Sequence, residues 1–217
     1  MIKNTHFLLF ALILLISNCK KEENKSFILK GQVTDARSGS AMGNVQIIAE
    51  QQLLEGGSFG GFYSEAAKGN TTSNGDFLLE WDNANIVEAR VTGSFEGYIT
   101  RVYNLNASSF QPGEEVTQNL SLFPEANIKV RLLKSGVVSN ATQINYRFEN
   151  ADFDCLCCNN NWRNITANYT DTTFTCRVYG DTWLRYRYEI LQPGETVFMR
   201  DSIFCTRNSL SNLTVEW

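Results

Sequence analysis

The chain has 217 residues, of which 43% are hydrophobic and 19% charged, and its formal net charge is −4. This composition excludes a disordered tail and a polytopic membrane protein, and the length suits one large domain or two small ones. Acidic residues outnumber basic ones by 23 to 19. We therefore expect no nucleic acid among the partners, because phosphate binding needs a basic surface.

Residues 1–18 are predicted to be a signal peptide. Lys3 precedes an unbroken apolar run at residues 7–16, which is too short for a membrane-spanning helix of about 20 residues. Ile16-Ser17-Asn18-Cys19 resembles the lipobox of bacterial lipoproteins, with Asn18 in place of the usual Gly, Ala or Ser. The resemblance implies that Cys19 is acylated and becomes the new N-terminus. The alternative is an ordinary cleaved signal peptide without a lipid.

A polar tether is predicted at residues 19–26, where Lys20, Lys21 and the Glu22-Glu23 pair show no apolar periodicity. Several long acyl chains hold a protein firmly on a membrane. We therefore expect an outer-membrane location through the N-terminal lipid, with the protein facing the periplasm or the cell surface.

Histidine chemistry is excluded from the predicted mature chain, because the single histidine, His6, lies in the signal peptide. A histidine base or histidine metal ligand is then absent. Carboxylate chemistry through Asp152, Asp154 and Glu189 stays open, but a small sandwich offers little room for the cleft that a glycosidase needs. We expect no enzymatic activity, no catalytic residue and no cofactor.

Residues 27–123 are predicted to form an antiparallel β-sandwich. Apolar residues recur there with a period of two, and turn signals such as Asn74-Gly75 and Pro112-Gly113 separate the segments. Short helices are expected only at residues 50–55 and 63–68. The predicted strands cover residues 27–34, 45–49, 77–81, 87–91, 98–102 and 116–122.

Three motifs in this region resemble carboxypeptidase regulatory-like domains. They are the opening Gly31-Gln32-Val33-Thr34-Asp35 with Gly43-Asn44-Val45-Gln46-Ile47, the turn Thr71-Thr72-Ser73-Asn74-Gly75-Asp76-Phe77, and Phe95-Glu96-Gly97-Tyr98. The resemblance implies a transthyretin-like sandwich of seven strands that serves as a non-catalytic spacer. Residues 53–68 depart from it, because they are longer than the connection usual in that family.

A second β-sandwich is predicted at residues 124–217. Phe123-Pro124 is expected to close the first domain, because proline interrupts a strand ladder. The fold class is therefore all-β, with two consecutive antiparallel sandwiches. The predicted strands of the second cover residues 128–133, 144–148, 173–178, 182–191, 196–204 and 213–217.

Five further cysteines lie in the second domain, and all are disulfide candidates: Cys155, Cys157, Cys158, Cys176 and Cys205. Neighbouring cysteines bridge each other only with strain, so Cys176 and Cys205 are the natural partners for two of the other three, and one thiol is left over. The alternative is a four-thiolate metal site. It lacks the second closely spaced cysteine pair that is typical of zinc sites, so we expect no metal.

The segment 182–190 is the predicted contact surface. With a period of two, Leu184, Tyr186, Tyr188 and Ile190 face the core, whereas Trp183, Arg185, Arg187 and Glu189 face outward. An exposed tryptophan beside two arginines suits a sugar ring or an anionic group. Trp162 is a further candidate. The alternatives are that a neighbouring segment covers this face, or that surface acids pair with the arginines.

These patterns together predict a non-enzymatic cell-envelope lipoprotein that binds a glycan or a protein. One alternative is an assembly component that docks on another outer-membrane protein, for which we expect a large apolar patch or an unpaired strand edge. A second alternative is metal binding through the cysteines.

Overall fold

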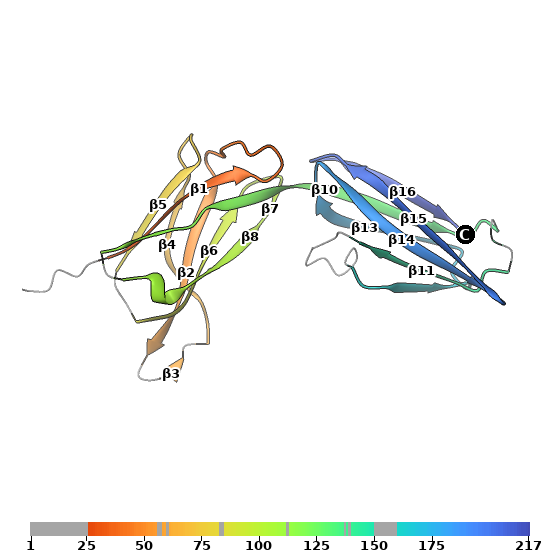
Figure 1. Ribbon diagram of the computed structural model, residues 1–217, viewed down its shortest axis with the longest axis horizontal. Coiled ribbons are helices and arrows are strands. Elements are labelled where there is room, and N and C mark those ends of the chain that lie inside the picture. The colour runs from red at the N-terminus through yellow and green to blue at the C-terminus, as the bar shows by residue number, and fades with distance from the viewer. Residues whose placement is uncertain are drawn as a thin grey trace, which may run out of the picture.

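The computed structural model describes residues 26–55, 58–59, 61–82, 85–111, 113–136, 138, 140–149 and 160–217. Nearly all of these residues belong to strands or to the turns between them (Figure 1). No helix among the described residues is long and apolar enough to cross a membrane. The predicted signal peptide, Cys19 and the tether up to residue 25 lie outside this part of the chain.

Two β-sandwiches follow one another along the chain, as predicted (Figure 1). The strands are β1 (Phe27–Asp35), β2 (Gln46–Glu55), β3 (Ser58–Phe59), β4 (Ser64–Asn70), β5 (Asp76–Trp81), β6 (Ile86–Ser94), β7 (Tyr98–Ile99), β8 (Arg101–Leu105), β9 (Glu115–Thr117), β10 (Leu120–Leu133), β11 (Gln143–Phe148), β12 (Arg163–Thr166), β13 (Asp171–Tyr179), β14 (Thr182–Gln192), β15 (Glu195–Cys205) and β16 (Leu210–Glu216), and one 3-10 turn spans Ala107–Ser109.

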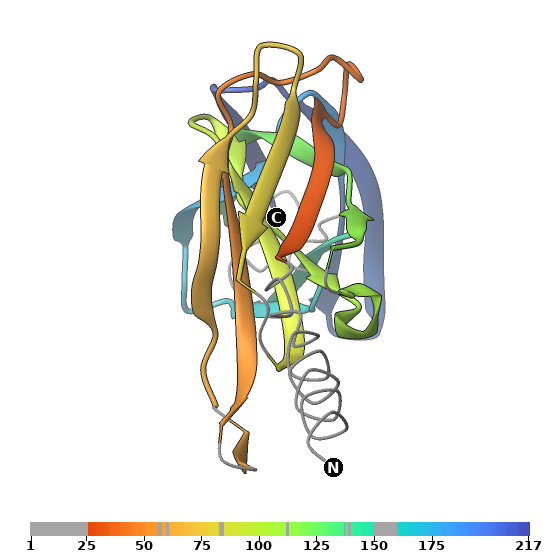
Figure 2. The same ribbon diagram turned by 90° about the vertical axis from the view of Figure 1, so that its left-hand side faces the viewer.

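The first sandwich packs two sheets around one core. β5, β1 and the start of β10 form one sheet with the short strands β7 and β9, and the other places β2 between β4 and β6, with β8 beyond β6. Alternation explains the layers, because Phe27, Leu29 and Val33 of β1 are buried while the residues between them are not. Figures 1 and 2 show the end of β2, where it pairs with β3, projecting beyond this sandwich.

A close approach of two backbones explains the glycine at position 31. A Cβ atom at Gly31 would lie 1.9 Å from the carbonyl oxygen of Gln118, in the segment that leads into β10. Any side chain would therefore push the two segments apart. This glycine lets the first strand of the domain lie directly beside the last.

The second sandwich packs the sheet β13-β10-β16 against the sheet β12-β11-β14-β15. All six strands predicted for this domain are present, and the short strand β12 is the one that was missed. The pairing in both sandwiches is mostly antiparallel, as expected, but β10 runs parallel to β1 and to β16. The buried core includes Ile128, Ile144, Phe148, Leu184 and Trp217.

β10 belongs to both sandwiches, and the prediction that Pro124 ends a strand is wrong (Figure 1). Up to Pro124 its partners are β1 and β7, and from Glu125 onward they are β13 and then also β16. Proline removes one ladder donor. Here the loss falls at the point where the strand changes partners, so the strand continues through it.

The two helices expected at residues 50–55 and 63–68 are also wrong, because these residues lie mainly in β2 and β4. β2 pairs with β4 on one side and with β6 on the other. An isolated helix of six residues is marginal in water. Strand pairing instead satisfies the backbone groups of the whole segment.

An ion-pair network joins the two sandwiches beside β10. Arg207, in the turn between β15 and β16, donates to both Asp181 in the second domain and Asp35 in the first, the latter at 2.9 Å between Nη1 and Oδ2. The hydroxyl of Tyr98 donates to the same oxygen of Asp35 at 2.7 Å. The Asp35 side chain is only 5% exposed, so solvent screens this interaction little.

The carboxyl group of Asp35 is held in its charged form. Burial raises its pKa, but hydrogen bonds from the backbone N–H groups of Ser38 and Arg37, the Tyr98 hydroxyl and the Arg207 guanidinium outweigh burial and lower the pKa to about 2. A carboxyl pKa that is lower in the folded state stabilises the protein at neutral pH. That contribution is lost as the pH falls from the unfolded value, 3.8, toward 2.

We expect the variant Asp35→Asn to lose less stability on acidification than the wild type does. The wild type should lose about 2 kcal/mol through this residue between about pH 4 and pH 2, because that is the linkage expected for a pKa shift of this size. Urea unfolding at pH 7, 4 and 2.5 measures the difference. Equal acid sensitivity of the two proteins would show that the Asp35 charge does not stabilise the junction.

Candidate functional site

The outward face of the sheet β12-β11-β14-β15 carries the residues that were predicted to make contacts. Along β14 the predicted alternation is clear at Trp183, which is 59% exposed, and at the buried Leu184 and Ile190, whereas residues 186–189 are all half-buried. Arg185 is exposed and Arg187 is half-buried. The inner side of this sheet packs on β13-β10-β16. No other sheet of the described chain packs on its outer side.

Three arginines lie directly opposite one another across the middle of this sheet. Arg147 of β11 pairs with Arg187 of β14, and Arg187 pairs with Arg200 of β15. Neighbouring strands are about 4.8 Å apart, so the backbone positions of three arginines share one line across three strands. We call Arg147, Arg187 and Arg200 the arginine row.

Trp162 lies at one end of the arginine row, immediately before β12. The guanidinium carbon of Arg147 is 4.8 Å from the centre of the Trp162 ring, and that of Arg187 is 5.5 Å from it. These are cation–π distances. Trp162 keeps 38% of its surface exposed, so the ring holds two arginines in place and still faces solvent.

Two of the three arginines in the row are paired with glutamates. Glu189 accepts from Arg187 at 3.1 Å, and Glu149 accepts from Arg200 at 2.8 Å. Among the described residues nothing accepts a hydrogen bond from the buried Nε of Arg147.

A hollow of ≈ 440 Å³ opens beside the arginine row. Its walls are mostly polar, and two members of the row contribute to it. The lining residues are Arg147, Phe148, Glu149, Asn160, Arg185 and Arg200. The hollow is therefore suited to a polar or anionic group.

Exposed aromatic rings flank the arginines on the same face. Trp183 and Phe204 are directly opposed across β14 and β15, with ring centres 5.5 Å apart. Phe198 is 59% exposed and lies 5.5 Å from the Arg187 guanidinium. Rings such as these offer flat apolar surface next to charged groups.

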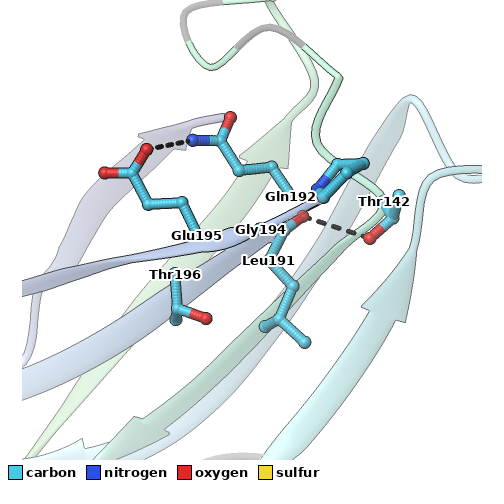
Figure 3. A pocket seen from close by; sticks show the side chains of 7 residues that line it. Thr142, Leu191, Gln192, Gly194, Glu195 and Thr196 are labelled. Atoms are coloured by element: carbon cyan, nitrogen blue, oxygen red, sulfur yellow. Dashed lines mark hydrogen bonds between the residues drawn. The ribbon is translucent and has the colours of Figure 1, made fainter.

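Another hollow lies at the turn between β14 and β15 (Figure 3). Its polar groups bond to one another, since Gln192 donates to Glu195 at 2.9 Å and the Thr142 hydroxyl donates to the Leu191 carbonyl at 3.1 Å. It contains no arginine or lysine. This hollow is therefore a weaker candidate than the arginine row.

Arg147, Arg200 and Phe198 were not singled out in the sequence. Each occupies an outward position of a predicted strand, so the alternation contained a signal for them. Their alignment with Arg187 depends on which strands are neighbours and in what register. A single sequence does not provide that information.

The cysteines follow the prediction only in part. Cys176 is disulfide-bonded, and its partner lies outside the described residues, as do Cys155, Cys157 and Cys158. The predicted bridge from Cys205 is wrong, because Cys205 is a free thiol with no exposed surface. Burial raises the pKa of this thiol, which keeps it protonated and unreactive.

The described residues contain no cluster of three or more metal-ligating side chains. The metal alternative rested on Cys155, Cys157 and Cys158, which are not described. For the carboxylate alternative, Asp152 and Asp154 also lie outside the described residues, and Glu189 is engaged with Arg187.

Comparison with known proteins identifies no family for this chain. No family model matches the chain, and no curated protein does. Among solved structures, the Bacillus anthracis TIE protein matches 89% of this chain at 13% identity with a TM-score of 0.36, and this chain spans 34% of its length. The shaft pilin SpaA of Lactobacillus rhamnosus GG matches 89% of this chain and 98% of its own at 13% identity, with a TM-score of 0.29.

A further match is the 3-chlorocatechol 1,2-dioxygenase of Rhodococcus opacus 1CP, at 16% identity and a TM-score of 0.34, over 48% of this chain and 61% of that one. Likeness at this level carries no argument about activity or partners.

We expect the thiols of Cys176 and Cys205 to differ in their conditions for alkylation. Cys205 should react with iodoacetamide in denaturant without reductant, but hardly in the native protein, because it is fully buried. Cys176 should react only after denaturation and reduction. Peptide mass spectrometry measures the labelling of each cysteine in three samples: native protein, denatured protein, and denatured protein with reductant. Labelling of Cys176 without reductant, or of Cys205 in the native protein within minutes, would contradict these assignments.

Proposed function

We propose that the chain is a non-enzymatic cell-envelope lipoprotein that binds a glycan or a protein through the outward face of β12-β11-β14-β15. The observation that carries the proposal is that the Trp162 ring lies within cation–π distance of two arginines on the outward face of this sheet. Arginine and tryptophan are the residues most enriched in binding surfaces. In this proposal the first sandwich is a spacer, as its resemblance to carboxypeptidase regulatory-like domains implies.

In this proposal, a lipid on Cys19 anchors the protein in the outer membrane. The support is the apolar run at residues 7–16 followed by the lipobox-like Ile16-Ser17-Asn18-Cys19. A rigid connection between the sandwiches suits such a placement. The strand β10 and the Arg207 network would hold the binding face at a fixed distance from the anchored end.

A second candidate function is assembly with another outer-membrane protein. Among the described strands, β15 pairs only with β14, so its other edge has no strand partner, although the Ser211 hydroxyl donates to the Phe204 carbonyl at 3.2 Å. Phe198, Met199 and Phe204 of this strand are 59%, 48% and 43% exposed. This edge would accept an extended strand from a partner protein.

Lipidation is expected to depend on Cys19. In a Gram-negative host grown with an alkyne-tagged fatty acid, the wild type should carry the tag and move to the membrane fraction. The variant Cys19→Ser should lose both, since its side chain cannot form the thioether link. Asn18→Ala is the matched control and should keep the tag. Tagging of Cys19→Ser, or membrane retention without a tag, would contradict the proposal.

Binding is expected to depend on Trp162. The purified protein and its variant Trp162→Ala should be compared on a glycan array and in a pull-down of cell-surface proteins. We expect saturable binding that falls at least tenfold in the variant, which is the loss of a typical aromatic contact. Phe62→Ala, which removes an 89% exposed ring from the first domain, should bind like the wild type.

Two outcomes of this comparison would overturn the proposal. Wild-type protein that captures no glycan and no surface protein favours the assembly function through the β15 edge. Equal capture by the wild type and a folded Trp162→Ala variant, with matching circular dichroism, places binding on another face.

A further inference from the structure

The arginine row is costly for folding unless something neutralises it. Like charges that lie directly opposite on neighbouring strands destabilise a sheet, and two such pairs occur side by side, Arg147 with Arg187 and Arg187 with Arg200. Glu189 and Glu149 offset the charge of Arg187 and Arg200. Within the described part of the chain, the buried Nε of Arg147 has no hydrogen-bond acceptor.

The same arrangement is well suited to anions. Arginine presents a planar fork that fits carboxylate and sulfate groups with two hydrogen bonds. Trp162 and Phe198 restrict the arginine side chains by lying against the guanidinium of Arg187, 5.5 Å away in each case. Side chains held in this way lose less entropy when they bind.

From the arginine row we propose that this face binds an anionic polysaccharide that bears carboxylate or sulfate groups along its length. This proposal rests on the proposed binding function. The face is four strands wide, and the hollow of ≈ 440 Å³ beside the row is shallow and polar. Such a surface suits a polymer that crosses the strands better than a small ion that needs an enclosing pocket.

The aromatic rings favour a polysaccharide over an acidic peptide. Sugar rings are rigid and have flat apolar faces, which can pack on Trp162 or on the Trp183–Phe204 pair while the acidic groups reach the arginines. An acidic peptide would have to immobilise flexible Asp and Glu side chains, which costs conformational entropy.

The test uses four probes: polygalacturonate for carboxylate, dextran sulfate for sulfate, dextran as a neutral polysaccharide and polyglutamate as an acidic peptide. Titration of the purified protein should show binding of polygalacturonate, dextran sulfate or both, at least tenfold tighter than that of dextran and polyglutamate. Binding should weaken as salt is raised from 0.05 to 0.5 M, because screening grows with ionic strength.

The double variant Arg187→Gln/Arg200→Gln should bind the polyanion about a hundredfold more weakly, which is about tenfold for each charged hydrogen-bonding group removed. Arg131→Gln/Arg177→Gln is the matched control. It also removes two charges and two exposed ion pairs, with Asp171 and Glu125, but from the opposite sheet of the same domain. The control should bind within twofold of the wild type.

The outcomes separate this inference from the proposed function. An equal loss in both double variants would show that total charge matters and not the arginine row, which overturns the inference. Binding of dextran or polyglutamate as tight as that of polygalacturonate and dextran sulfate also overturns it. In that case, binding that depends on Trp162 would leave the proposed function standing. No binding of any probe, together with no capture in the array and pull-down, would overturn both.

Discussion

The strand β10 is the constraint on which the arrangement of this protein depends, because both hydrophobic cores are built on it. Leu120 and Leu122 are buried in the first core, and Ala126, Ile128 and Val130 are buried in the second. A strand that keeps its extended geometry across the junction cannot act as a flexible linker. A hydrogen-bonded network closes the junction beside it and consists of Asp35, Tyr98, Asp181 and Arg207. The two sandwiches are therefore connected by more than a flexible linker.

This junction determines where the proposed contact surface lies relative to the first domain. The sheet β13-β10-β16 is tied to the first domain through β10, and the sheet β12-β11-β14-β15 packs on its other side. The outward face of the latter sheet therefore points away from the strand that connects the domains. A period of two then divides its side chains, so that Ile144, Leu184 and Ile190 fill the core while Arg147 and Arg187 stay outside.

Local pattern was enough to predict the layers, and it failed wherever distant partners decide the outcome. Alternation located the six principal strands of the second domain and the outward position of Trp183 and Arg187. It could not show that β10 exchanges partners at Pro124, because that depends on residues such as Tyr98 and Tyr179 that are far away in sequence. A disulfide was predicted for Cys205 because secreted proteins commonly contain disulfides, yet this residue lies in the apolar core. Strand register, the information that aligns Arg200 with Arg187, has no local signature.

In this domain the residues that stabilise the fold differ from those of the proposed binding face. Core packing rests on buried apolar side chains, and the junction rests on Arg207 and its two aspartates. The three arginines of the row belong to neither, and like charges in register would oppose folding without the glutamates that pair with Arg187 and Arg200. A surface that costs stability and contributes nothing to the core is typical of a functional site. The three arginine positions are in register across the sheet, and one buried Nε has no acceptor among the described residues. A ligand with several acidic groups would therefore offset the charge along the row.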